Sequence, residues 1–271
     1  MRVFAIRDED SEEQKDLAYL FYYELEKRFY VELPEQADPW ETPLLLSTFA
    51  RRGEYTVNSY WSKLWVQQRI VPTDRQNLGQ ILKENGLQEY DEFELLMLAN
   101  GRCAQDSYYL TEIREAELPK EILQRDQKKV EEVVPLRENQ LLVFFRDGSV
   151  KKCDIWELAG KDIRFKPILN HETLFCTVEI QTGGYGVCWG ENLLLAYPVL
   201  YESGIGVPIS MWDLKQLIAY RVVNTAEAAE ILDCSRQNIN DLIHRDKLHP
   251  VKSDQKSNLF LKGEIVQRRW Q

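Results

Sequence analysis

The sequence predicts a multidomain protein with a mainly α N-terminal domain, a small α+β middle domain and a C-terminal module of two helices, a hairpin and a closing helix. Three observations predict this division. The polar segment 119–132 lacks aromatic residues, and the hydrophobic period changes there from about 3.6 to about 2. The charge also changes, because the acidic residues gather in the first half. We therefore expect domains at 1–127, 128–204 and 223–271, with a connecting helix within 205–222.

Composition limits the class of protein. The 271 residues, of which 44% are hydrophobic, are enough for two or three domains with cores. No apolar run reaches the roughly 18 residues of a transmembrane helix, and the N-terminus becomes acidic where a signal peptide is apolar. The five cysteines never form CxxC pairs, which favours reduced thiols, although Cys176 and Cys188 are placed for contact across a hairpin. We expect a cytoplasmic, prokaryotic protein that does not contact a membrane.

The charge is unevenly distributed along the chain. The whole chain has a formal net charge of −10, and residues 1–132 alone hold 17 Lys and Arg against 27 Asp and Glu. From Ser235 to the end there are 8 basic and 4 acidic residues, a net of +4. The acidity therefore belongs to the N-terminal half, and the C-terminal segment is locally basic enough to approach an anionic partner.

The N-terminal half contains the start and stop signals of several helices. Capping boxes at 11–14 and 73–76 begin two helices, the second ending at Gly86. An apolar stripe at helical spacing follows the first box and consists of Leu17, Leu20, Phe21, Leu25 and Phe29. Further helices are predicted from Pro43 to Gly53, around Trp61, Leu64 and Trp65, and from Asp91 to Gly101.

Some residues of the acidic half are of kinds found in enzyme sites. The ExK triplet 13–15 lacks a preceding strand with a metal-binding Asp, so we interpret it as a solvated helix face. Asp91 to Glu94 with Arg102, Cys103 and Asp106 is polar enough for a site, but capping and surface roles explain it equally well. The tryptophans and a tyrosine stripe form core or a partner surface; they are Trp40, Trp61, Trp65, Tyr19, Tyr22, Tyr23 and Tyr30. We expect no catalytic residue, no metal site and no cofactor.

The middle segment alternates in the manner of strands. Gln140–Phe145 and Ser149–Cys153 predict a hairpin around Asp147-Gly148, the dipeptide of a type I′ turn, followed by a short helix at 154–160. A second hairpin is predicted from 173–181 and 185–189 around two glycines.

Several features of this segment occur together in one known family. They are Phe145 before Asp147-Gly148, the helix-initiating Asp154, Phe175, Trp189 and Leu200-Tyr201. In this order they resemble DUF2442, a domain family of unknown function, over residues 130–204. The resemblance implies a fold, and members of that family are sometimes fused to, or encoded near, helix-turn-helix modules.

The C-terminal segment predicts two helices joined by a short turn. Thr225 is placed to cap a first helix, 226–232, and Ser235 to cap a second. In the second helix Ile239, Leu242 and Ile243 share a core face. Strands at 248–252 and 259–261 and a closing helix from Lys262 follow. The order helix, turn, helix, hairpin and helix is that of a winged helix-turn-helix.

The string TAEAAEILDCSRQNINDLIHRDKLHPVK also resembles the excisionase and MerR-like winged-helix family over residues 223–270. Small residues in the first helix, the SRQ start of the second and the KL-x-P-V entry to the wing carry the resemblance. Cys234 stands where a valine-like residue is usual, and Asp241 and Asp246 place negative charge near the expected DNA face. The resemblance implies contact with double-stranded DNA.

We expect the site to divide into two sets of residues. The side chains expected to reach base edges are Arg236, Gln237 and Asn240. The remaining contacts, mostly to phosphates, are assigned to Ser235, His244, Arg245, Lys247, Lys252 and Lys256. Because so small a module buries little surface, we expect a homodimer or a protein partner, with Trp212, Leu214, Leu217 and Ile218 as the dimer contact.

The sequence therefore predicts a sequence-specific DNA-binding regulator, a repressor or autoregulator with an antitoxin-like organisation. Its acidic N-terminal half would bind a ligand or a basic protein. The alternative is a protein–protein adaptor or sensor whose winged helix contacts protein rather than DNA. A third possible function is catalysis by the N-terminal domain.

Overall fold

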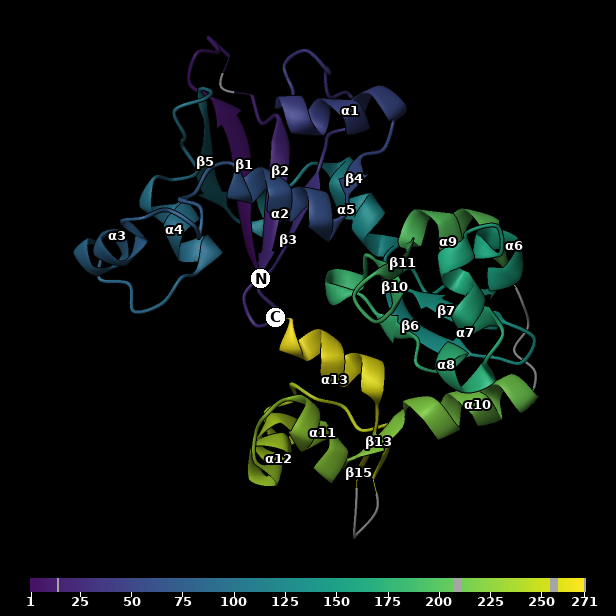
Figure 1. Cartoon of the computed structure of the whole chain (residues 1–271). Helices are drawn as coiled ribbons and strands as arrows, with labels where there is room; N and C mark the ends of the chain where they lie inside the picture. The colour runs from purple at the N-terminus through teal and green to yellow at the C-terminus, as the bar shows by residue number, and fades with distance from the viewer. Residues whose placement is uncertain (14, 207–210, 254–257, 271) are drawn as a thin grey trace. The chain divides into compact units, whose positions relative to one another are not determined.

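The computed structural model describes residues 1–13, 15–206, 211–253 and 258–270. The chain divides into two compact units, Met1–Leu123 and Gln124–Gln271 (Figure 1).

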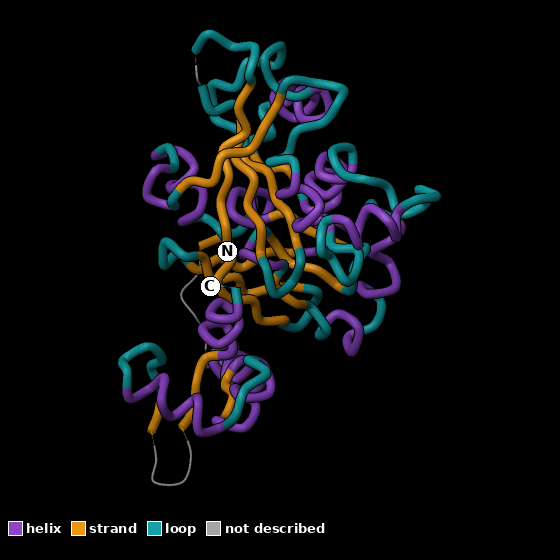
Figure 2. Tube along the Cα trace, turned by 90° about the vertical axis from the view of Figure 1, so that its left-hand side faces the viewer, coloured by secondary structure: helices purple, strands orange, loops and turns teal. Residues whose placement is uncertain are grey.

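A five-stranded antiparallel sheet in the order β4-β3-β2-β1-β5 dominates the first unit. Strands are drawn in orange in Figure 2. Its strands are β1 (Arg2–Asp8), β2 (Ala18–Tyr23), β3 (Arg28–Glu32), β4 (Thr56–Val57) and β5 (Tyr108–Ile113). The prediction of a mainly α N-terminal domain is therefore wrong.

The error lies in the stripe that was expected to form the first helix. It folds as the β2–β3 hairpin, in which Tyr22 lies opposite Phe29 and Phe21 opposite Tyr30. Every residue of β2 is buried, so apolar residues occur on both of its faces and do not alternate with polar ones. Some of them therefore also fit the spacing of a helix. Tyr, Phe and Val also favour strands, and Lys27 adopts a positive φ of 50° in the turn. Ser11 donates its hydroxyl to the carbonyl of Glu13, whereas Gln14 of the expected capping box lies outside the described residues.

The helices of this unit agree with the predicted start and stop residues better than the strands do. They are α1 (Leu44–Arg52), α2 (Ser59–Gln67), α3 (Leu78–Glu84), α4 (Glu92–Leu98), a short 3-10 turn (Glu115–Glu117) and α5 (Lys120–Gln127), which crosses the unit boundary. Pro43 and Gly53 flank α1 as predicted, and Asp91 caps α4 by accepting from the amides of Phe93 and Glu94. The capping box at 73–76 is wrong, because α3 begins only after Asn77.

The predicted tyrosine and tryptophan stripe is mostly core. Tyr22 stacks on Phe93 at 4.0 Å between ring centroids, and Trp65 is buried in the same cluster. Tyr19, Tyr23 and Tyr30 are buried too, whereas Trp40 is 85% exposed.

The second unit begins with two small sheets. The four-stranded sheet has the order β12-β8-β7-β6 and the three-stranded sheet the order β11-β10-β9. Their strands are β6 (Val130–Pro135), β7 (Gln140–Phe145), β8 (Val150–Asp154), β9 (Glu179–Ile180), β10 (Gly186–Trp189), β11 (Leu193–Ala196) and β12 (Ile205–Gly206). The helices are α6 (Ile155–Ala159), α7 (Lys166–Leu169), α8 (Glu172–Phe175), α9 (Tyr197–Ser203) and α10 (Met211–Arg221), with 3-10 turns at Ile163–Phe165 and Thr182–Gly184.

The first predicted hairpin is confirmed, and Asp154 caps α6 as expected. Its turn is not type I′, because Gly148 has a positive φ of 83° and Asp147 does not. The second hairpin is shorter than predicted. Only β9 and β10 pair there, whereas residues 172–175 form α8. Strand β6 begins within the polar segment 119–132, in which the domain boundary was expected.

The C-terminal segment folds around its own core. Its elements are β13 (Val222–Asn224), α11 (Thr225–Ile231), α12 (Arg236–His244), β14 (Lys252–Ser253), β15 (Asn258–Leu261) and α13 (Lys262–Arg269) (Figure 1). The sheet order is β13-β15-β14, and β13 was not predicted. The cap of α11 is Asn224 rather than Thr225, with Glu227 completing a capping box. Ile239, Phe260 and Ile265 are fully buried in the core between these elements.

Candidate functional site

Helix α12 presents a polar face to solvent. Ser235 caps the helix by accepting a hydrogen bond from the Asn238 amide at 3.2 Å. Ile239 is fully buried and fixes the rotation of the helix against the core. The side chains that remain exposed in this part of the helix include Arg236, Gln237 and Asn240. We call these three residues, together with Ser235, the polar face.

The residues assigned to phosphate contacts lie around this face. Arg245 and Lys247 are exposed just after α12, and Lys252 is exposed on β14. His244 is exposed, and its Nδ1 lies 2.7 Å from the Asn240 carbonyl, so that nitrogen carries the proton and donates within the helix. Lys256 lies outside the described residues.

The two acidic residues near the polar face are both exposed. Asp246, which has a positive φ of 56°, places Oδ1 3.0 Å from Nε2 of His249. Asp241 lies on α12 itself. Their negative charge opposes phosphate binding at this surface.

A buried cluster joins the C-terminal segment to the first strand of the unit, and sequence reasoning missed it. Glu132 on β6 pairs with Arg221, at 3.0 Å between Oε1 and Nε, and its Oε2 accepts from the Gly263 amide at 2.9 Å. Arg221 also donates to the carbonyls of Val133 and Val178. Burial raises the pKa of Glu132, outweighing the attraction of Arg221. Glu132 ends the polar segment 119–132, in which a charged residue gave no signal of this role.

The expected dimer contact is only partly available. Leu217 on α10 packs against Val134, Leu136 and Leu142 of the same chain, which withdraws it from contact with a second copy. Ile218 is exposed, whereas the side chains of Trp212 and Leu214 are not among those that the structure describes.

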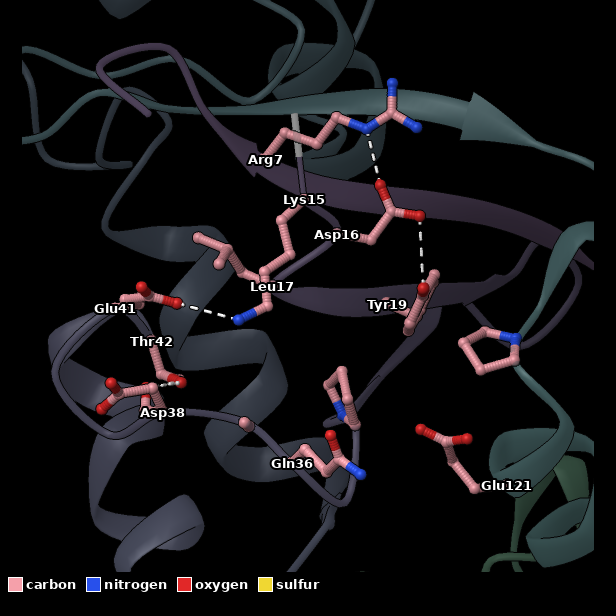
Figure 3. A pocket seen from close by; sticks show the side chains of 13 residues that line it. Arg7, Lys15, Asp16, Leu17, Tyr19, Gln36, Asp38, Glu41, Thr42 and Glu121 are labelled. Carbon is pink, nitrogen blue, oxygen red and sulfur yellow. Dashed lines mark hydrogen bonds and ion pairs between the residues drawn. The ribbon is translucent and has the colours of Figure 1, made fainter. Parts of the chain in front are cut away.

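The first unit contains a polar hollow of about 520 Å³ (Figure 3). Along one side Arg7 donates to Asp16 at 2.6 Å, and Tyr19 donates to the other carboxylate oxygen at 3.2 Å. Lys15 pairs with Glu41 at 3.0 Å. Burial raises the pKa of Tyr19, so its hydroxyl remains a donor. Both basic groups of the hollow thus have carboxylate partners, and the separation of these residues in the sequence gave no motif to find.

The structure does not bring the other candidate residues of this unit into one site. Asp91 caps α4 and pairs with Lys27. Asp106 forms a bidentate pair with the buried Arg69, at 2.8 and 2.7 Å, while Arg102 pairs with Glu9. Cys103 also accepts from the Arg69 guanidinium, at 3.3 Å, so it shares this partner with Asp106, whereas Asp91 and Arg102 pair elsewhere.

Within the described part of the chain, no group of three or more His, Cys, Asp and Glu is arranged to hold a metal ion. None of the described helices is both long and apolar enough to cross a membrane.

The residues that carried the family resemblance form two groups of contacts in the second unit. Tyr201 donates its hydroxyl to Asp147 at 2.7 Å, and its ring packs edge-on against Phe145 at 4.9 Å. Trp189 is buried and donates to the carbonyl of Phe175 at 2.8 Å. These contacts join the first hairpin to α9 and the second hairpin to α8.

No curated protein and no solved structure matches the chain. Residues 130–206 match the family described as protein of unknown function (DUF2442), in agreement with the resemblance seen in the sequence, and this segment is a DUF2442 domain.

Proposed function

We propose that the chain is a sequence-specific DNA-binding regulator, acting as a repressor or autoregulator, whose C-terminal module is a winged helix-turn-helix. The observation that carries the proposal is the polar face of α12. Arg236, Gln237 and Asn240 are exposed at the start of a capped helix whose opposite side is anchored by Ile239. In helix-turn-helix proteins the first turns of the second helix lie nearest the base edges. Arg pairs with guanine, and Asn or Gln with adenine, through two hydrogen bonds each.

The surroundings of the polar face support the same proposal. Asp233, with a positive φ of 50°, and Cys234 make the tight turn between α11 and α12, and the Cys234 amide bonds back to Ala229 at 2.9 Å. The β14–β15 hairpin carries the exposed Lys252. The net charge of +4 from Ser235 onward gives phosphates a favourable surface.

Selection of duplexes from a random pool on the full chain tests the proposal. We expect an enriched motif, binding that weakens as salt rises, and loss of the motif in Arg236→Ala/Gln237→Ala. Lys161→Ala/Arg164→Ala, on exposed residues of the DUF2442 domain, is the control that should keep the motif. Selection without an enriched motif would overturn the proposal.

The alternative function is an adaptor or sensor whose α12 contacts protein. The exposed Asp241 and Asp246 favour it, because carboxylates at this surface repel phosphates and suit a basic protein partner. The two functions differ in salt dependence and in the requirement for a DNA motif.

A further inference from the structure

A groove of about 860 Å³ lies in the first unit, between α1, α2 and the segment that leads into β5. Trp65 and Arg69 belong to its buried floor. Leu44 and Trp61 line its accessible side, and Leu44 is 87% exposed. Helical leucines of a closed core are covered by other side chains, whereas this one opens α1 and points to solvent.

Exposed aromatic residues extend the apolar surface beyond the groove. Tyr60 is exposed next to Trp61, and their rings meet edge-on at 5.3 Å. Trp40 is exposed and lies under the guanidinium of Arg51 at 5.3 Å. Exposed apolar groups that cluster in this way mark interaction surfaces.

The groove also carries cations. Arg51 and Arg52 are exposed in the last turn of α1, and among the described residues neither forms an ion pair. Their positive charges complement the helix dipole, which explains why they lie in the last turn of α1. The dipole does not explain why Leu44 and Trp61 are exposed in the same groove. The first 132 residues carry a net charge of −10, so these unpaired arginines stand out against an acidic unit.

The floor holds donors that lack acceptors. Trp65 Nε1 and Arg69 Nε are buried and have no hydrogen-bond partner within the described part of the chain. Both belong to residues fixed in place, since the Arg69 guanidinium lies over the Trp65 ring at 4.1 Å and is held by Asp106. Buried N–H groups normally find an acceptor, so these unsatisfied donors on two lining residues make the floor of the groove polar beneath its apolar rim.

We propose that this groove binds a peptide segment of a partner protein, in which a bulky apolar side chain is flanked by acidic residues. The apolar side chain would enter between Leu44 and Trp61, and the carboxylates would pair with Arg51 and Arg52. A peptide fits better than a small molecule, because the apolar and cationic groups continue outside the groove to Trp40 and Tyr60. The site is independent of the DNA-binding proposal, and it reverses the expectation that the acidic half captures a basic partner.

Selection from a displayed library of random twelve-residue peptides on the full chain tests this. We expect enriched peptides with an aromatic or leucine residue beside Asp or Glu, and dissociation constants on the order of micromolar. Arg51→Glu/Arg52→Glu should weaken their binding at least tenfold. Lys83→Glu/Lys120→Glu, which changes the net charge equally at exposed residues elsewhere in the unit, should leave it unchanged.

A second pair of variants separates binding from folding. Leu44→Asp should abolish peptide binding, and Leu98→Asp, at another exposed leucine on α4, should not. Circular dichroism establishes that each variant is folded. The proposal is overturned if no peptide is enriched, if the enriched peptides lack carboxylates, or if they bind the Arg51→Glu/Arg52→Glu variant as well as the wild type.

Discussion

The carboxylate of Glu132 and the guanidinium of Arg221 form a buried ion pair, with 3.0 Å between Oε1 and Nε. The second carboxylate oxygen accepts from the Gly263 amide at the start of α13. One side chain of the DUF2442 domain thus holds both the end of α10 and the first turn of α13. This carboxylate, together with the bonds from Arg221 to the carbonyls of Val133 and Val178, joins the C-terminal segment to the β6 sheet.

Glu132→Gln should change how stability depends on pH. Burial raises the pKa of Glu132 above its ordinary value of 4.5. A carboxyl group with a higher pKa in the folded state binds protons more tightly there, so the protein loses stability as the pH rises from 4.5 through the folded pKa. Urea unfolding at several pH values should show this loss in the wild type and not in Glu132→Gln. Glu230→Gln, at an exposed carboxylate, should keep the wild-type slope; equal slopes in all three proteins would contradict the prediction.

Gly263→Ala should destabilise the protein by about 1–3 kcal/mol, because overpacking displaces buried groups. A Cβ at this position would lie 2.6 Å from Glu132 Oε2 and 3.0 Å from the Glu131 carbonyl. Gly79, also the second residue of its helix, has open space around it, so Gly79→Ala should stabilise by about 0.5–1 kcal/mol. The free energies of urea unfolding of the two variants check this, and a shift of the same sign in both would be inconsistent with it.

Ser235→Ala should remove the cap of α12 and cost about 1 kcal/mol, because the Asn238 amide loses its acceptor. Ser235→Asn should retain nearly all of the stability, since Asn is an equally good cap. Hydrogen exchange of the Asn238 amide measures the effect locally, and it should quicken in the Ala variant alone. If both variants exchange as slowly as the wild type, the cap does not stabilise α12.

Asp241→Asn should strengthen DNA binding about two- to fivefold at low salt, because one exposed negative charge near the phosphates is removed. The gain should shrink as salt increases. Glu230→Gln on α11 removes an equal charge from another helix and provides the control. Fluorescence anisotropy with the selected duplex gives both affinities. Unchanged or weaker DNA binding by Asp241→Asn would contradict the prediction.

The sequence predicted those parts of the fold that are determined by neighbouring residues. Asp91 and Ser235 cap their helices, and Pro43 and Gly53 bound α1, because each signal acts within one turn. The β2–β3 hairpin was missed because a strand buried on both faces carries no alternation.

The same distinction applies to the candidate sites. The exposure of Arg236, Gln237 and Asn240 could be predicted, since one helix places all three opposite Ile239. The groove could not, because Leu44, Arg69 and Tyr108 come from separate elements that only the sheet topology brings together. The pairing of Glu132 could not be predicted either, since its buried partner Arg221 lies far along the chain.

Strand β13 also affects how the C-terminal segment can be isolated. In the sheet β13-β15-β14, β15 is the central strand, and Val222 to Asn224 pair with Leu261 to Leu259. A fragment that begins at Thr225 would leave β15 with an open edge, and such edges promote aggregation. It would also lack Asn224, the cap of α11. A fragment used for crystallisation or spectroscopy should therefore begin before Val222.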